Sequence, residues 1–262
     1  MAEEAFATGR DVRLAARGGR WAQPTAGLAP GYVQTNLVIL PQSHALDFLR
    51  FCLRNPKPCP IVDVTPPGDP RPDLAVAEDA DLRTDLPRYR VHRDGQFAEE
   101  VTGVEHLWQG DWVGILLGCS FTFEYALQQA GVPVRHVECG CNVPMYITNR
   151  QTHQAGPFRS PLVVTMRPIP GDLVGKAVRL TARYPQAHGA PVYVGDPAGL
   201  GIPDLARPDF GDPVPIRPGE VPVFWACGVT TQLAVMAAKL PMVITHAPGH
   251  MFVTDLRVAE AI

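Results

Sequence analysis

Two short segments place a cysteine where an apolar strand is expected to end and a helix to begin. Cys119-Ser120 follows the apolar run 111–117, and Cys227-Gly228 follows the run 221–226. The first N–H groups of a helix have no partner inside the helix, so they and the helix dipole stabilise an anion and lower the pKa of a thiol. We predict that Cys119 and Cys227 are catalytic and that these turns bind a substrate through Ser120, Gly228, Thr230 and Thr231. In the plainer alternative, Ser120 only caps the helix and Cys119 is only a small buried residue.

The segment His246-Ala247-Pro248-Gly249-His250 predicts a rigid loop that presents imidazoles to a pocket. Proline and glycine between the histidines forbid the continuous helix that a metalloprotease histidine pair requires, so the spacing of four does not indicate zinc. Imidazoles titrate near neutral pH, and we predict that His246 and His250 are catalytic acids or bases. Alternatively, each histidine only bonds loop carbonyl groups.

Further polar residues are predicted to bind the substrate. The segment 141–149 is dense in amide and hydroxyl groups around a proline, which indicates a binding loop or simply turn chemistry. Arg167 ends a predicted strand and could hold a carboxylate with two parallel hydrogen bonds. His188 and Asp196 bracket a short predicted strand, and for Asp196 a turn role is the stronger interpretation. The additional candidates are Asn142, Tyr146, Asn149, Arg167, His188 and Asp196.

No cofactor is predicted, and a metal is left open. Cys139-Gly140-Cys141 with His136 could contribute metal ligands, but a fourth ligand of recognisable spacing is missing, so no metal-binding residues are assigned. The three lysines, Lys57, Lys176 and Lys239, lie in settings that do not favour a Schiff base, which disfavours pyridoxal phosphate chemistry. The sequence also lacks a glycine-rich phosphate loop.

The composition of the chain and the positions of its prolines and glycines predict the elements that position these residues. The chain has 28 Pro and 24 Gly among 262 residues, which excludes long helical bundles, while 46% hydrophobic residues argue against disorder. Asp94-Gly95 predicts a hairpin turn, because both central residues of such a turn need a positive φ. The predicted elements are the hairpin strands 89–93 and 96–101, strand 111–117, helix 121–130, strand 132–137, strand 221–226, helix 230–239 and strand 242–246.

The two strand-turn-helix-strand units favour an α/β fold with a largely parallel or mixed sheet and covering helices. Ser43 is expected to cap a helix to about Arg54 and Asp172 another, with strands at 161–167 and 191–195. We predict a discontinuous main α/β domain from 1–134 and 201–262, and a smaller inserted α/β domain at 135–200. Ligands of open α/β sheets bind beyond the carboxyl ends of the strands, where both cysteines fall.

The charge of the chain disfavours polyanionic partners. With 23 basic and 26 acidic residues, the net charge of −3 gives no field that would hold a nucleic acid or an acidic membrane. The six cysteines are interpreted as reduced thiols. The first residues carry acid where a signal peptide has base, and no apolar run approaches the ~18 residues of a membrane span. We predict a soluble, cytoplasmic protein with a small carboxylate or amino-acid substrate; a homo-oligomer is left open.

Over about residues 25–256 the chain resembles the D-glutamate cyclase family, whose bacterial members are also described as hydro-lyases. The resemblance is carried by long segments in the same order along the chain. They are 31–37 (GYVQTNL), 118–124 (GCSFTFE), 142–146 (NVPMY), 164–168 (VTMRP), 188–192 (HGAPV), 208–212 (PDFGD), 224–230 (FWACGVT) and 244–252 (ITHAPGHMF).

The resemblance implies a lyase of amino acid metabolism with two α/β domains. The implied reaction removes water from D-glutamate and gives 5-oxo-D-proline. In that reaction the amine attacks the γ-carboxyl group, whose leaving oxygen must be protonated and whose oxyanion must be stabilised. On this hypothesis the helix-start N–H groups hold the carboxyl oxygens, Arg167 anchors the α-carboxylate, and His246 or His250 moves the protons.

Two other functions stay open at this point. Two thiols on opposite sides of a Cα atom can exchange its proton, so Cys119 and Cys227 also fit a cofactor-independent racemase or epimerase. The third possibility is a carboxylate-binding module that holds its ligand without turnover.

Overall fold

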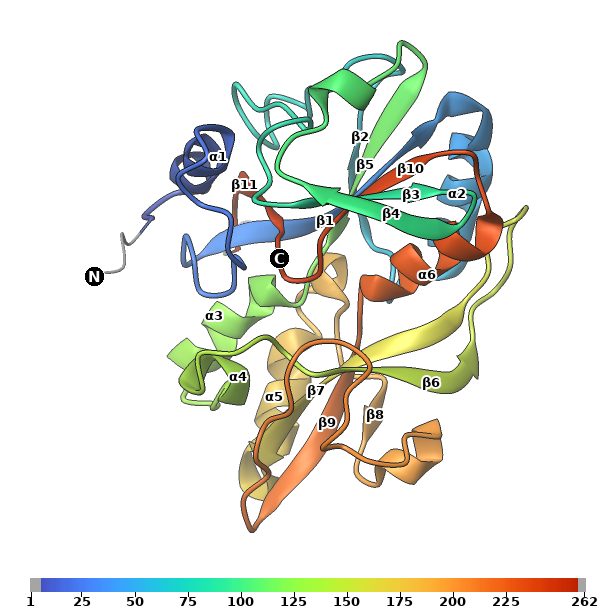
Figure 1. Cartoon of the computed structure of the whole chain (residues 1–262). Helices are drawn as coiled ribbons and strands as arrows, with labels where there is room; N and C mark the ends of the chain where they lie inside the picture. Colours follow the sequence, from blue (N-terminus) through green and yellow to red (C-terminus); the bar gives the residue numbers. More distant parts are fainter. Residues whose placement is uncertain (1–5, 259–262) are drawn as a thin grey trace.

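The computed structural model describes residues 6–258 and contains two antiparallel β-sheets (Figure 1). Residues 1–5, on which the prediction about a signal peptide rests, lie outside the described residues, as do residues 259–262. Every strand pair that forms these sheets is antiparallel. The predicted α/β fold with a largely parallel or mixed sheet and covering helices is therefore wrong.

The seven-stranded sheet has the order β2-β5-β1-β10-β3-β4, and β11 also pairs with β1. Helix α1 (Gly9–Arg17) packs against β11, and helix α2 (Gln42–Arg54) packs against β1 and β5. The strands are β1 (Tyr32–Pro41), β2 (Ile61–Val64), β3 (Tyr89–Arg93), β4 (Gln96–Val101), β5 (Trp112–Gly118), β10 (Val243–His246) and β11 (Phe252–Arg257).

The four-stranded sheet has the order β6-β7-β9-β8. Its strands are β6 (Met145–Gln151), β7 (Pro161–Pro170), β8 (Tyr193–Val194) and β9 (Glu220–Ala226). The remaining α-helices are α3 (Phe121–Gln129), α4 (Arg135–Glu138), α5 (Val174–Thr181) and α6 (Val229–Ala238). Short 3-10 helices are η1 (Glu105–Leu107), η2 (Gly171–Leu173), η3 (Pro185–Ala187) and η4 (Pro197–Leu200).

The chain crosses between the sheets at the two predicted strand-turn-helix units. After β5 of the seven-stranded sheet, α3 leads to β6 of the four-stranded sheet, and after β9 of the four-stranded sheet, α6 leads back to β10 (Figure 1). A strand-helix-strand unit gives parallel neighbours only when both strands join the same sheet. Because each unit here changes sheets, the expected parallel sheet does not form.

The predictions of individual elements had mixed outcomes. The hairpin of β3 and β4 is confirmed, with φ of 50° at Asp94 and 79° at Gly95. The predicted strand 132–137 is wrong, because helix α4 occupies its second half. Ser43 does not cap α2, which begins after Pro41, and Asp172 lies in η2 ahead of α5.

The division into domains at residues 134 and 200 stays a prediction. Sheet membership follows a different division, because β9 lies within 201–262 and pairs with β7 in the four-stranded sheet. Strands β6 and β7 come from the predicted insert, whereas β9 does not.

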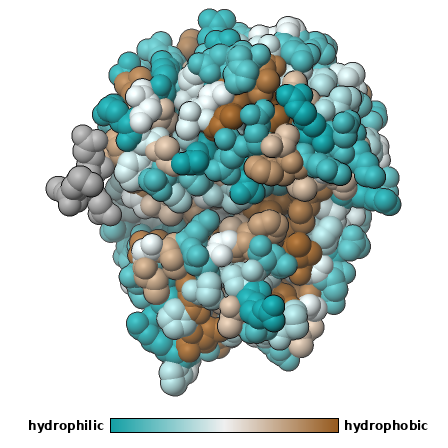
Figure 2. Space-filling model, viewed as in Figure 1, coloured by the Kyte–Doolittle hydropathy of each residue, from teal (hydrophilic) through white to brown (hydrophobic). Residues whose placement is uncertain are grey.

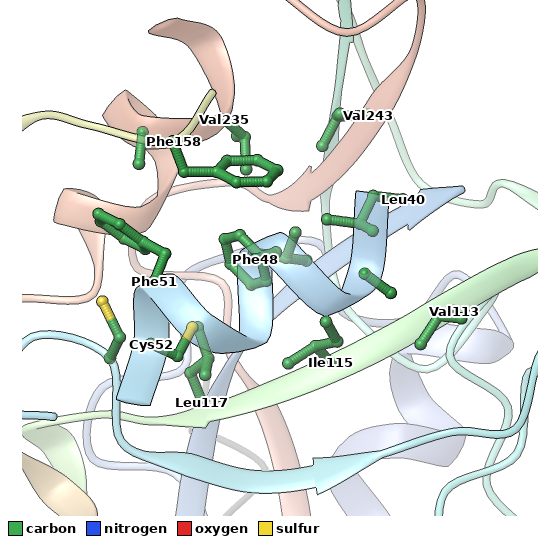
Figure 3. Packing of buried hydrophobic residues seen from close by; sticks show 14 of the residues in the cluster. Leu40, Phe48, Phe51, Cys52, Val113, Ile115, Leu117, Phe158, Val235 and Val243 are labelled. Carbon is green, nitrogen blue, oxygen red and sulfur yellow. The ribbon is translucent and has the colours of Figure 1, made fainter. Parts of the chain in front are cut away.

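An aromatic cluster joins the two sheets. Phe158, from the loop between β6 and β7, packs between α2 and α6, and its ring centroid lies 5.2 Å from that of Phe48 (Figure 3). Asn55 at the end of α2 exchanges two hydrogen bonds of 2.8 Å with the backbone of His153 in the same loop. Burial of these rings and pairing of the polar groups hold the β6–β7 hairpin on the seven-stranded sheet.

The surface mixes polar and apolar residues. On the face shown in Figure 2, hydrophobic residues form separate patches among hydrophilic ones. Among the described residues, no helix combines the length and the apolar character needed to cross a membrane. Cytoplasmic location stays a prediction.

Candidate functional site

A narrow pocket lies where the two crossings between the sheets meet. The end of β5 and start of α3 contribute one wall, through Cys119, Ser120 and Phe121. The end of β9 and start of α6 contribute another, through 227–229. The other lining residues are Asn36, Asn142, Val143, Met145, Thr165, His188, His246, Pro248, Gly249 and Met251.

The two cysteines occupy equivalent positions in the two crossings. Each is 8% exposed, and the backbone N–H of each donates to a neighbouring strand, Cys119 to Gln34 at 3.1 Å and Cys227 to Val163 at 3.0 Å. Burial raises the pKa of Cys119 to about 12, against the lowering effect of the Phe121 backbone N–H. Burial likewise raises the pKa of Cys227 to about 11, against the Val229 N–H. Both groups are therefore thiols at neutral pH.

The guanidinium group of Arg167 is not free to bind a ligand in the pocket. It is fully buried between the rings of Phe123 and Trp225 and forms an ion pair with Glu124, which also lies 3.1 Å from His136 Nε2. Burial alone would raise the pKa of Glu124, but His136 and Arg167 hold it at about 2. Glu124 is therefore a carboxylate, and it neutralises the predicted carboxylate anchor.

Arg167 instead orients two hydroxyl groups that line the pocket. Its guanidinium donates to Ser120 Oγ and to Thr165 Oγ1, each at 3.0 Å. An accepting hydroxyl keeps its own hydrogen for a further bond. Ser120 makes no side-chain cap on α3. The buried cation thus prepares Ser120 and Thr165 as donors toward the pocket.

Two histidines line the pocket and differ in how their nitrogens are held. His188 Nδ1 donates to the Lys57 carbonyl at 2.7 Å, which leaves Nε2 as the site for a proton. His246 has Nδ1 at 3.1 Å from the Leu37 backbone nitrogen and Nε2 at 3.3 Å from the Gln232 side-chain nitrogen. Burial lowers the pKa of each histidine to about 4. His188 also has a φ of 77°, a strained conformation of the kind that occurs at functional sites.

The structure brings part of the predicted site together. The pocket contains Cys119, Cys227, Ser120, Asn142, His188, Gly228 and His246. His250 lies at the end of the same loop, half-buried, and its Nδ1 donates to the Pro248 carbonyl at 3.0 Å. Burial lowers its pKa, and it is not among the lining residues.

Other predicted residues make structural contacts away from the pocket. The Tyr146 hydroxyl donates to the Leu205 carbonyl, and the Asp196 carboxylate caps η4 through the Ala198 N–H. Asn149 is exposed and packs against Gly201.

The threonines of the second turn are held by nearby backbone. Thr230 Oγ1 accepts from the Val163 N–H at 3.0 Å, and Thr231 Oγ1 donates to the Gly228 carbonyl at 2.6 Å. These hydroxyls stabilise the start of α6 and do not line the pocket.

Sequence reasoning missed three polar residues of the site, Asn36, Glu124 and Thr165. The Asn36 side chain donates to the Gly118 carbonyl at 2.8 Å, and it packs against Gly228. All three lie in segments that carried the family resemblance. A polar residue in an otherwise apolar strand or helix is the signal that could have found them, because burying it requires a partner.

Residues 6–258 hold no cluster of three or more histidine, cysteine or acidic side chains placed to bind a metal ion. His136 is buried beside Glu124, whereas Cys139 is exposed. The Cys139 and His136 side chains therefore lie in different surroundings.

The fold and the pocket describe a two-sheet protein with a narrow pocket lined by residues from both sheets. Residues 113–255 match the family model of D-glutamate cyclase. A relative from Bordetella pertussis is 60% identical over 249 residues, which cover 95% of this chain and 89% of the relative. Relatives from Rubrobacter xylanophilus (61% over 250 residues, 95% and 96%) and Geobacillus kaustophilus (58% over 248 residues, 95% and 94%) are equally similar. All three are named "Putative hydro-lyase". The chain belongs to the D-glutamate cyclase family, which confirms the resemblance.

Proposed function

We propose that this protein is a hydro-lyase that removes water from a small amino acid, with D-glutamate as substrate and 5-oxo-D-proline as product. The family and the names of the relatives support the reaction class. The observation that carries the proposal is the convergence of two helix starts and two oriented hydroxyls on one pocket.

A substrate carboxylate fits the donors of this pocket. Ser120 and Thr165 each have a hydroxyl hydrogen to donate, because their oxygens already accept from Arg167. The starts of α3 and α6 add partial positive charge at the same place. The Arg167–Glu124 pair sets the direction of the hydroxyls without presenting a cation to the ligand.

In the proposed reaction, His188 moves the protons of the cyclisation. Its Nε2 takes one proton from the substrate ammonium group, and the amine nitrogen then attacks the γ-carboxyl carbon. As the amide forms, the nitrogen loses a second proton, the C–O bond breaks, and both protons leave on the departing water. A carboxylate bound beside His188 raises the pKa of this imidazole from about 4 toward neutral pH, which makes it a better base.

The test is incubation of the purified protein with D-glutamate and detection of 5-oxoproline by mass spectrometry. His188→Gln should lower the rate by about 100-fold or more, the contribution of a general base. His106→Gln is the matched control, because His106 is an exposed histidine in η1, outside the pocket. Binding of D-glutamate without product would overturn the proposal in favour of a non-catalytic carboxylate-binding module.

A further inference from the structure

Cys119 and Cys227 form a matched pair across one pocket. Each follows the last residue of a strand, and each precedes an α-helix of nine or ten residues. Each sulfur has the backbone N–H two residues ahead as a hydrogen-bond donor, while burial keeps both groups in the thiol form at neutral pH. The strands belong to different sheets and the chain crosses in opposite directions at the two points. The two sulfurs thus approach the same space from two separate walls.

The surroundings of the pair suit a proton transfer between them. Cys119 and Cys227 belong to one apolar cluster with Val143, Met145 and Met251, so water has little access to the sulfurs. The same pocket holds the Ser120 and Thr165 hydroxyls, which can stabilise the negative charge on a carboxylate whose Cα has lost a proton. His188 Nε2 can accept the proton that one thiol releases first, because Nδ1 is bonded to the Lys57 carbonyl.

We propose that Cys119 and Cys227 catalyse proton exchange and inversion at the Cα atom of a bound amino acid. One thiol gives its proton to His188 and becomes a thiolate. The thiolate takes the Cα proton from one face of the substrate, and the electron pair moves into the carboxylate as an enolate. The other thiol then donates its proton to the opposite face and becomes the thiolate. No electrons are exchanged with another reagent, and the protein ends with one thiol and one thiolate, as it began the transfer.

This activity rests on the part of the proposed function that binds the amino-acid carboxylate, and it does not require loss of water. The two can therefore be separated in a single experiment. D-glutamate and L-glutamate are each incubated with the whole protein in deuterated water. Mass spectrometry measures deuterium at Cα, chiral chromatography measures inversion, and the same samples are assayed for 5-oxoproline.

We expect deuterium at Cα and interconversion of the two enantiomers. Cys119→Ser and Cys227→Ser should each lower the rate of inversion by about 100-fold or more, because a serine hydroxyl is a much weaker acid than a thiol. Cys139→Ser is the control, since Cys139 is exposed. Circular dichroism of each variant checks that it has folded.

The outcomes separate the two proposals. Formation of 5-oxoproline with no deuterium at Cα would overturn the thiol-pair mechanism and leave the hydro-lyase intact. Deuterium at Cα without 5-oxoproline would support the thiol pair and count against the hydro-lyase. Exchange that persists unchanged in both folded serine variants would also overturn the thiol-pair mechanism.

Discussion

The two crossings between the sheets have the same shape but different chemistry. At the Cys119 crossing, the hydroxyl of Ser120 is bonded to a buried ionic cluster, which we define as Arg167, Glu124 and His136. At the Cys227 crossing, Gly228 packs against the neutral side chain of Asn36. One crossing is therefore organised by charge and the other by close packing.

The difference shows how one pocket can have both hydrogen-bond donors and closely packed walls. The ionic cluster presents no charged group to the pocket, but Arg167 orients the hydroxyls of Ser120 and Thr165. The glycine of the other crossing lets the asparagine and the start of α6 approach closely, because a side chain there would meet Asn36 at 2.3 Å. Substitutions at each crossing can separate the contribution of the buried charges from that of close packing.

The largest effect is expected from removing the cation of the Cys119 crossing. Arg167→Met leaves the buried Glu124 carboxylate without one of its two partners, His136 and Arg167, and should lower the free energy of unfolding by about 3–5 kcal/mol. Asn36→Ala removes the neutral side chain that packs against Gly228 at the other crossing, together with its hydrogen bond to the Gly118 carbonyl, and should cost about 1–2 kcal/mol. Urea unfolding at pH 7.5 measures both. An Arg167→Met protein as stable as Asn36→Ala would show that the ionic cluster does not organise its crossing.

As the pH falls, protonation of the two pocket histidines should lower the free energy of unfolding before protonation of the ionic cluster does. His188 and His246 have a folded-state pKa of about 4 against 6.5 in the unfolded chain, so folding favours their neutral forms. That stability is present above pH 6.5 and is lost as the pH falls toward 4, by up to about 3 kcal/mol for each histidine. Glu124 has a pKa of about 2, so its contribution is lost only below about pH 4.5.

Unfolding at pH 7.5, 5.5 and 4.5 measures this dependence. His188→Gln and His246→Gln should each make stability less sensitive to pH between 6.5 and 4.5. The assignment fails if both variants keep the full slope of the unsubstituted protein in that range.

A smaller difference is expected between the glycines of the crossings. A Cβ at Gly118 would lie 1.6 Å from the Gln186 carbonyl oxygen, which is backbone, whereas a Cβ at Gly228 would meet the Asn36 side chain. A side chain can shift more easily than backbone. Gly118→Ala should therefore cost about 3 kcal/mol and Gly228→Ala about 1 kcal/mol. Thermal unfolding ranks the two variants, and the reverse order would contradict the packing described for the second crossing.

The smallest effects are expected from the hydroxyls. Ser120→Ala should weaken binding of D-glutamate about tenfold, the worth of one hydrogen bond, and should cost about 1–2 kcal/mol of stability because it removes an acceptor of the buried Arg167 guanidinium. Thr231→Ala should leave binding unchanged, because its hydroxyl is bonded to the Gly228 carbonyl. Calorimetric titration measures both affinities. Equal losses of affinity would mean that Ser120 does not contact the ligand directly.

The sequence predicted some local features of this molecule and missed others, such as helix α4 in the place of the predicted strand 132–137. The Asp94-Gly95 hairpin and the position of both cysteines at strand ends follow from neighbouring residues alone. Sheet membership did not follow, because β5 and β9 have the same apolar character whichever sheet they join. Strand partners are long-range contacts, which periodicity does not encode.

The sequence indicated which types of residue form the site, but it did not indicate the role of each residue. A strand-end arginine suggests carboxylate binding, yet Glu124, 43 positions away, neutralises Arg167. Nothing beside His188 in the sequence indicates that its Nδ1 would donate to the Lys57 carbonyl or that its φ would be positive. Those facts depend on the tertiary fold.

We propose that the space between the two crossings binds an amino-acid carboxylate. A crystal structure of the protein with D-glutamate would show whether it does. We predict a carboxylate within hydrogen-bond distance of Ser120 Oγ and Thr165 Oγ1, at the starts of α3 and α6, with Cα between Cys119 and Cys227. D-glutamate bound elsewhere on the molecule, with only water between the crossings, would contradict the claim.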